Sequence, residues 1–290
     1  MPAAQPVETV PARPGARGAR LEPAAKYALL GVLAVIFLGP FYWLVVTALK
    51  GPGQNVFSYP PQLLPLPPTL QSFRDLWQVG PFHRYIFNSA VVAIAVVLGN
   101  VLFCSMAAYP LARMRFPGRD LIFYLILATL MIPFEVTLIP SFTIISKLHW
   151  VDTYQALIVP ACVSPFGIFL MRQTFLTIPF ELEEAARIDG ANEFTIYWRI
   201  MMPLALPALA TVAIFVFVAE WNSLLWPVIV LKSQEMQTLP IAITFLDSNF
   251  YGGWRQIAAG SVLSIIPILI VFLFAQRYFI AGLTTGALKG

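Results

Sequence analysis

The stretch EEAARIDGANEFTIYWRIMMPLALP, residues 183–207, is the longest charged, turn-rich segment in an otherwise strongly apolar chain. Of the 290 residues, 59% are hydrophobic and only 11% are charged, whereas soluble domains carry about 25% charged residues. The mean hydropathy is +0.77. These values indicate an integral membrane protein in which the quoted stretch connects two membrane spans.

Six apolar runs are each long enough to cross a hydrocarbon core of about 30 Å as a helix. They cover residues 28–49, 85–109, 121–142, 156–174, 204–231 and 257–280. The sequence therefore predicts an all-α, polytopic membrane protein with six transmembrane helices. The tail of residues 1–27 is rich in Pro, Ala, Gly and Arg and has no apolar periodicity, so we expect it to be disordered.

The positive charges are divided unequally between the two sides of these spans. The chain has 18 Lys and Arg residues. With the N-terminus in the cytoplasm, only six of them face outward: Lys50, Arg74, Arg84, Lys147, Lys232 and Arg255. Cytoplasmic loops carry the excess of Lys and Arg, so this orientation is favoured. Both termini and the quoted stretch are then cytoplasmic.

The quoted stretch predicts two short helices joined at a turn. Acidic residues fill the first turns of a helix over residues 180–189, where the helix dipole favours negative charge. Gly190 stands where a left-handed residue ends a helix, and Asn192 is a suitable cap for the second helix. Within the first helix, Glu183 and Arg187 have the i, i+4 spacing of an ion pair.

Two roles are open for this helical hairpin. It could lie on the lipid surface with its aromatic side chains among the headgroups, a role that suits a basic polar face. Its polar face is instead mainly acidic, and the shallow face around Ala185 and Ala186 permits close approach of another surface. The acidic balance favours a cytoplasmic protein partner.

The hairpin resembles the EAA loop of the permease subunits of ATP-binding-cassette (ABC) importers. The positions that carry the likeness are Glu184, Ala185, Ala186, Asp189, Gly190, Ile200 and Pro203. We identify them as the candidate residues for coupling to an ATPase, because in that family the loop seats in a cleft of the ATPase subunit.

The resemblance covers nearly everything after residue 28 and points to carbohydrate importers of the maltose type, in particular to their second permease subunit. It rests on Asn88-Ser89, Ala107 to Arg113, Met131-Ile132-Pro133, Trp221-Asn222, Trp226-Pro227 and Arg277 to Gly290. Two residues depart from the family pattern. Met202 replaces a common Leu, and Pro110 replaces an Ala and is expected to kink the end of its helix.

The resemblance implies several partners and no chemistry in this chain. A second permease subunit would complete a heterodimeric pore, two cytoplasmic ATPase subunits would bind ATP and Mg, and an extracytoplasmic sugar-binding protein would deliver the solute. This chain would then be no enzyme and would hold no cofactor. The implied cargo is a sugar or sugar-like solute, such as an oligosaccharide or glycerol phosphate. The outer loops, residues 50–84 and 232–256, would receive the binding protein, with Trp77, Tyr251 and Trp254 as candidate contacts.

Polar residues inside the spans are candidates for the solute path. An ionisable residue in a span normally faces a bundle interior or a wet cavity. The candidates are Glu135, Glu220, Trp221 and Asn222, because carboxylates and amides bind sugar hydroxyls and Trp221 or Trp226 can stack on a sugar face. Hydrogen bonding between helices is the alternative for these residues, and we favour it for Asn88 and Asn100.

Other function classes fit the sequence less well. Cys104, Cys162, His83 and His149 are too few and too dispersed to predict a metal site. No G-x-x-x-x-G-K-[ST] loop is present, so the chain should not bind ATP in that manner. A secondary transporter driven by an ion gradient remains the main alternative, although we see no inverted repeat. A membrane-embedded enzyme would need a clustered acidic or histidine site at one membrane face.

Overall fold

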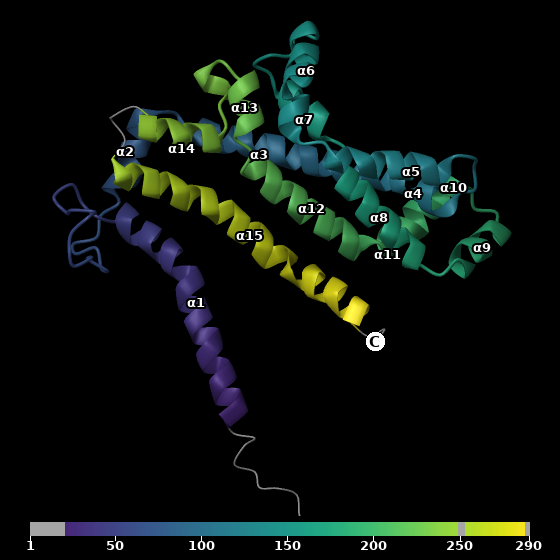
Figure 1. The fold of residues 1–290 in the computed structure, drawn as a ribbon, viewed down its shortest axis with the longest axis horizontal. Helices are drawn as coiled ribbons and strands as arrows, with labels where there is room; N and C mark the ends of the chain where they lie inside the picture. Colours follow the sequence, from purple (N-terminus) through teal and green to yellow (C-terminus); the bar gives the residue numbers. More distant parts are fainter. Residues whose placement is uncertain (1–20, 249–252, 288–290) are drawn as a thin grey trace, which may run out of the picture.

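The computed structural model describes residues 21–248 and 253–287, and within these ranges the chain folds into helices joined by turns (Figure 1). The N-terminal half contains α1 (Leu21–Ala48), α2 (Gln71–Val79), α3 (Phe82–Gly99), the π-helix η2 (Asn100–Cys104), α4 (Ser105–Arg113), α5 (Arg119–Ala128), η3 (Thr129–Met131) and α6 (Phe134–Lys147). The C-terminal half contains α7 (Tyr154–Ala161), α8 (Pro165–Thr177), α9 (Glu181–Ile188), α10 (Glu193–Ile196), the π-helix η4 (Tyr197–Met201), α11 (Met202–Leu204), α12 (Leu206–Trp221), α13 (Leu225–Val230), η5 (Gln234–Met236), α14 (Leu239–Ser248) and α15 (Trp254–Ala287).

Four helical segments of the described chain are long and apolar enough to cross a membrane. They are Ala25–Ala48, Phe82–Arg113, Tyr154–Thr177 and Trp254–Gln276. Two further pairs of helices meet the same criterion but are bent, and the number rises to six if each bent pair is one span. The all-α, polytopic fold class is therefore confirmed.

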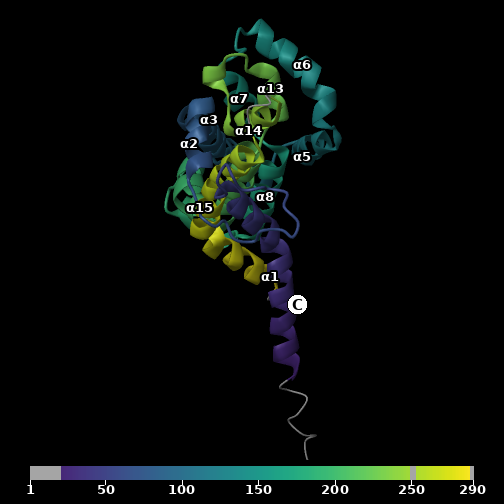
Figure 2. The same ribbon diagram turned by 90° about the vertical axis from the view of Figure 1, so that its left-hand side faces the viewer.

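The predicted third span, residues 121–142, is not one straight helix. Arg119–Met131 and Phe134–Lys147 meet at 102°. Ile132 and Pro133 between them have extended backbone conformations, because a proline lacks the amide N–H for the helix ladder and disfavours helical geometry in the residue before it. As a result α6 projects from one side of the bundle (Figures 1 and 2).

The predicted fifth span, residues 204–231, is also divided. A 76° bend between Glu193–Leu204 and Leu206–Trp221 stands at its start, and within it α12 ends at Trp221. The Asn222 side chain then donates to the Val218 carbonyl at 2.7 Å, which also accepts from the Asn222 backbone amide at 3.3 Å. The remainder of the expected span forms the separate helix α13.

The expected boundaries at the two ends of the chain are partly wrong. The tail was expected to be disordered through residue 27, but α1 begins at Leu21, and only residues 1–20 of that tail lie outside the described residues. The last helix reaches Ala287, beyond the predicted end at residue 280. Tyr251 lies outside the described residues, whereas both of the loops predicted to face outward contain helices, α2 in the first and α14 in the second.

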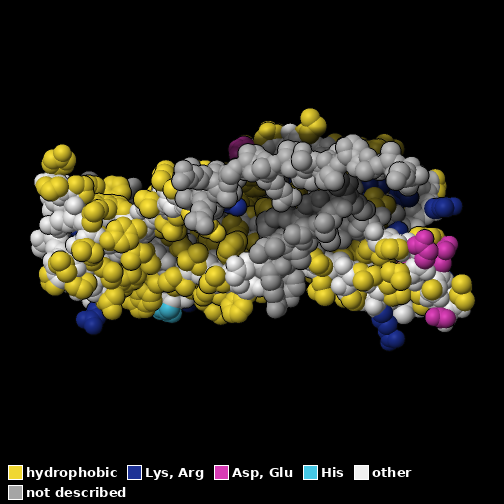
Figure 3. Space-filling model, turned by 90° about the horizontal axis from the view of Figure 1, so that it is seen from below, with side chains coloured by type: hydrophobic (Ala, Val, Ile, Leu, Met, Phe, Trp, Pro, Cys, Tyr) yellow, Lys and Arg dark blue, Asp and Glu magenta, His cyan; other side chains and the backbone are white. Residues whose placement is uncertain are grey.

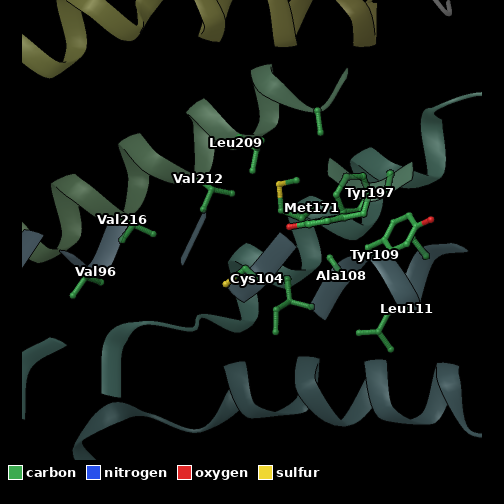
Figure 4. Close-up of a cluster of buried hydrophobic side chains, with 14 of the residues drawn as sticks. Val96, Cys104, Ala108, Tyr109, Leu111, Met171, Tyr197, Leu209, Val212 and Val216 are labelled. Atoms are coloured by element: carbon green, nitrogen blue, oxygen red, sulfur yellow. The ribbon is translucent and has the colours of Figure 1, made fainter. Parts of the chain in front are cut away.

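The main core packs around the second span. Side chains of α3, η2 and α4 meet those of α8 and α12, among them Cys104, Ala108, Met171 and Val212 (Figure 4). The backbones approach closely here: a Cβ added at Gly99 would lie 2.6 Å from Cys162 Sγ. A second buried cluster joins α2, α14 and α15 to α3 and α12. The α9 end and the α2 end are thus held together by the long helices between them.

The surface divides into an apolar body and a charged end. Hydrophobic side chains cover much of the face seen in Figure 3, while acidic side chains gather at the end where α9 lies. Helix α1 packs against α15 near its C-terminal end and diverges from the bundle along the rest of its length (Figures 1 and 2). Only 6% of the most apolar 18-residue stretch of this helix is buried.

Candidate functional site

The hairpin at the charged end is built by the caps that its sequence predicts. Gly190 has φ +85°, the left-handed conformation that costs glycine little. The amides of Gly190 and Ala191 donate to the Arg187 and Ala186 carbonyls at 3.1 and 2.9 Å, which closes α9 in a Schellman motif. Asn192 Oδ1 accepts from the Thr195 amide at 2.8 Å and caps α10. These two features of the sequence interpretation are confirmed.

A buried carboxylate anchors the hairpin to the second span. Glu183 is 0% exposed, and its Oε1 lies 2.8 Å from Nε of Arg113, at the end of α4. Its Oε2 accepts from Arg187 Nη2 at 3.1 Å, which confirms the i, i+4 pair. The Arg113 side chain is 8% exposed and also donates to the Ile178 carbonyl. Burial strengthens these interactions but makes each partner costly to remove.

The network continues into the second helix of the hairpin. Arg187 Nε donates to Glu193 Oε1 at 2.8 Å, and this bond raises the pKa of the Arg187 guanidinium above its ordinary value. Tyr109 OH, on α4, donates to Glu193 Oε2 at 2.7 Å. Both helices of the hairpin are therefore bound to α4 through charged side chains.

The side of α9 opposite this anchor faces solvent. Ile188 is 86% exposed at the turn, and the family-motif residues Glu184, Ala185, Asp189 and Gly190 are exposed as well. Ala186 is half-buried and packs on the core, Ile200 is half-buried in η4, and Pro203 is exposed in α11. The hairpin thus presents a rigidly held surface of acidic and apolar side chains.

A cavity of about 490 Å³ lies beyond the far end of α12. Its lining residues come from α3, α6, α7, α12, α13 and the segments between them: Ser89, Val92, Phe134, Ser141, Leu157, Pro160, Ala161, Ala219, Glu220, Ser223, Leu224, Leu225, Trp226, Pro227 and Thr238. The volume falls within the roughly 300–1,000 Å³ of small-ligand pockets.

The four candidates for the solute path do not come together. Glu220 lines the cavity. Trp221 is buried on another side of α12, where its indole donates to the Ser264 carbonyl at 2.9 Å. Asn222 is exposed and bonds within its own helix end, and Glu135 is exposed in the first turn of α6. The tryptophan that lines the cavity is Trp226.

The two buried asparagines bond between helices. Asn88 donates to the Glu235 and Gln237 carbonyls, both at 2.8 Å, and accepts from Tyr154 OH at 2.6 Å. Asn100 donates to the Ala161 carbonyl at 2.6 Å. These contacts agree with the helix-joining interpretation of both side chains.

Within the described residues no group of His, Cys, Asp and Glu is placed to hold a metal ion.

Sequence reasoning named Tyr109 and Arg113 only as part of the family likeness and missed their contacts with the hairpin and the anchoring role of Glu183. The i, i+4 rule finds Arg187 as the local partner, but it has no means of finding a residue 70 positions earlier. The arginines that close the second span, Arg113 and Arg115, were the available signal, since a helix end placed beside the hairpin needs partners for its charges.

Comparison with known proteins agrees with this arrangement. Residues 100–285 match the family "Binding-protein-dependent transport system inner membrane component". The chain is 45% identical over 223 residues to the arabinooligosaccharides transport system permease protein AraQ of Halalkalibacterium halodurans, covering 77% of this chain and 80% of AraQ. It is 37% identical over 263 residues to the sn-glycerol-3-phosphate transport system permease protein UgpE of Yersinia enterocolitica, with 88% and 92% covered.

A solved structure shows the same fold. It is a bacterial ABC transporter involved in the import of the acidic polysaccharide alginate, and one of its chains aligns with a TM-score of 0.77 and 25% identity over 92% of this chain and all of that chain. Together with the family match over residues 100–285, these likenesses establish that the chain belongs to the binding-protein-dependent transport system inner membrane components, the permease subunits of ABC importers.

Proposed function

We propose that this chain forms one half of a heterodimeric pore that carries an oligosaccharide-type or glycerol-phosphate-type solute across the cytoplasmic membrane. The names of its relatives AraQ and UgpE support these two solute classes. A second permease subunit completes the pore. Two cytoplasmic ATPase subunits bind ATP and Mg and carry out hydrolysis, and an extracytoplasmic sugar-binding protein delivers the solute. Six spans, with both termini in the cytoplasm, fit the distribution of Lys and Arg.

The observation that carries the proposal is the construction of the hairpin. Its inner side is fixed to α4 by the buried Glu183, while Ile188 at its turn is 86% exposed. Leu182, Phe194 and Trp198 of the same hairpin are exposed as well, and several exposed apolar side chains on one short segment are typical of a surface that another protein covers. Movement of a partner seated here would pass through the ion pairs into the second span as a rigid-body displacement.

Each residue of the family motif has a place in this proposal. Ala185 allows close seating of the ATPase, and Glu184 and Asp189 provide polar contacts. Gly190 sets the angle between the helices of the hairpin. Ala186, Ile200 and Pro203 join the hairpin to the bundle and to α12.

Replacing Gly190 by alanine tests the coupling role against a matched control. Gly190 and Gly118 have φ of +85° and +81°, and an added Cβ would meet nothing within 4 Å at either position. The left-handed conformation costs a non-glycine residue about 1–2 kcal/mol, so both variants carry the same strain. ATP-driven uptake into vesicles holding the complete importer should fall by about tenfold for Gly190→Ala and remain near wild type for Gly118→Ala.

Equal loss of uptake in both variants would show that general strain, rather than the hairpin angle, impairs transport. Expression and pairing with the second permease are measured for both proteins, since neither should change. Uptake that persists without the ATPase subunits would favour a secondary transporter driven by an ion gradient.

A further inference from the structure

The cavity beyond α12 contains a carboxyl group that the fold leaves without a partner. Glu220 is half-buried among the lining residues, and its side-chain carboxyl group forms no hydrogen bond or ion pair with any residue that the structure describes. Burying an ionisable group without a partner is costly. Such a group normally marks a place where a ligand or water supplies the missing interaction.

A second unpaired polar group lines the same cavity. Thr238 is 4% exposed, and its hydroxyl oxygen has no hydrogen-bond partner. Buried hydroxyls are usually bonded, so this one is also available to a ligand. Ser141 and Ser223 add two further hydroxyls to the lining. The cavity therefore offers a carboxyl and several hydroxyl groups at separate points around one volume.

The apolar part of the lining suits the faces of a sugar ring. Trp226 is fixed by its indole N–H, which donates to the Ala156 carbonyl at 2.9 Å, and Phe134 packs edge-on against it with ring centroids 6.0 Å apart. Ligand pockets combine such aromatic walls with a few convergent polar groups. Both rings are held in place before any solute enters.

The charges that line the cavity distinguish an oligosaccharide-type solute from a glycerol-phosphate-type solute. No Lys or Arg occurs among the described lining residues, whereas phosphate and carboxylate ligands are usually held by Arg or Lys side chains. The first residues of α6 and α13 line the cavity, but the first turn of α6 carries Glu135, whose charge disfavours an anion at that helix end. A carboxylate accepts hydrogen bonds from hydroxyl groups but repels an anion. The balance favours an uncharged polyhydroxylated solute over a phosphate ester or an acidic sugar.

We propose that this cavity is a passage site in this subunit for uncharged sugars and that Glu220 excludes anionic solutes from it. The proposal rests on the proposed role of the chain as a sugar permease. It narrows the solute to the neutral oligosaccharide class and assigns part of the selection to the membrane subunit itself.

Thiol labelling in the complete importer tests the charge of the cavity directly. Ser223 is replaced by Cys in a background in which Cys104 and Cys162 are Ala, and labelling of this subunit is followed with methanethiosulfonate reagents of opposite charge in mildly alkaline buffer. Charge interactions over a few ångströms near a protein surface exceed thermal energy severalfold. The cationic reagent should therefore react on the order of tenfold faster than the anionic one, and Glu220→Gln should bring the two rates together.

Protection by solutes tests the ligand class in the same preparation. Arabinobiose should slow labelling of the Ser223→Cys protein, and glycerol 3-phosphate at equal concentration should not. Equal protection by both solutes, or equal rates for both reagents in the protein that retains Glu220, would overturn the proposal. A thiol that neither reagent reaches would overturn it too, because Glu220 would then belong to a contact with the second permease.

ATP-driven uptake is measured in parallel to separate this inference from the proposed function. An importer that moves no solute in response to ATP would contradict the proposed function, while the labelling ratio would still report the charge of the cavity. Normal uptake with no difference between the two reagents would contradict only the cavity proposal.

Discussion

The carboxylates at the two ends of the segment from the hairpin to Trp221 differ in whether they have partners. At the hairpin, Glu183 contacts two arginines within 3.1 Å, and Glu193 bonds to Arg187 and Tyr109. At the far end of α12, Glu220 has no partner in the described chain and lines a cavity instead. The first arrangement fixes the hairpin to α4, and the second leaves the Glu220 carboxyl group available to a ligand.

This difference shows how charged residues in a membrane protein can be assigned to structure or to function. A paired charge is costly to break and adds rigidity. An unpaired one adds little to the fold, so its presence needs another reason. The contrast can be tested by removing each carboxylate in turn.

The largest expected effect follows from the matched substitutions Glu183→Ala and Glu220→Ala. Glu183→Ala leaves Arg113, which is 8% exposed, without its carboxylate. Removing one partner of a buried ion pair costs roughly 3–5 kcal/mol. Glu220→Ala breaks no hydrogen bond or ion pair within the described chain and removes a partly buried, unpaired carboxyl, so stability should stay the same or rise. Thermal unfolding of the two purified variants in detergent measures both effects.

A conservative double variant controls the first substitution. Replacing Glu183 by Gln and Arg113 by Met together removes both charges, and its stability should recover much of the loss, since uncharged replacement of a buried pair is often tolerated. If Glu220→Ala destabilises the protein as strongly as Glu183→Ala does, the contrast between the two ends fails.

An intermediate effect is expected at the exposed turn of the hairpin. Ile188→Asp changes a side chain that is 86% exposed, so the stability of the isolated subunit should stay within about 0.5 kcal/mol of wild type. If a partner covers this residue, burial of an isoleucine contributes about 1.5–3 kcal/mol. Association with the ATPase should then weaken by about tenfold or more. Co-purification and titration of the ATPase subunit give the measurement.

Ile188→Met, which keeps an apolar side chain at the turn, should retain the ATPase. Unchanged association of the Ile188→Asp protein would instead favour the lipid-surface interpretation of the hairpin.

The smallest expected effect concerns the cap of α10. Asn192→Ala removes the acceptor for the Thr195 amide and should cost about 1 kcal/mol. Hydrogen exchange at that amide should accelerate, while exchange in α12 stays unchanged. Asn192→Ser keeps a capping oxygen and should behave like wild type; equal acceleration in this variant would show that the cap contributes nothing measurable.

The sequence predicted the local features of the hairpin well because their causes are local. Gly190 and Asn192 act on the backbone within a few residues, and the spacing of Glu183 and Arg187 fixes their contact on one helix face. The fold class followed from apolar runs long enough to span a bilayer. The family motif added the prediction of a docking surface, which remains a proposal for the experiments above.

The features that the sequence did not reveal depend on contacts between distant segments or on helix breaks inside apolar runs. Nothing near Glu183 in the sequence points to Arg113, and nothing near Trp221 shows that it bonds to Ser264 rather than facing the cavity with Glu220. Pro133 within the apolar run indicated a break in the helix. Its 102° bend was not, because prolines inside membrane helices are often accommodated by neighbouring groups.

The wide turn η2 determines the rotational phase of the second span. A π-turn holds one more residue than an α-turn, and one residue rotates the helix that follows by about 100°. Everything after Asn100–Cys104, including Tyr109 and Arg113, faces its present direction because of that extra residue. Deleting one residue from η2 would leave the span apolar and nearly as long. It would turn both anchoring side chains away from the hairpin and separate the proposed ATPase contact from the α3 residues that line the cavity.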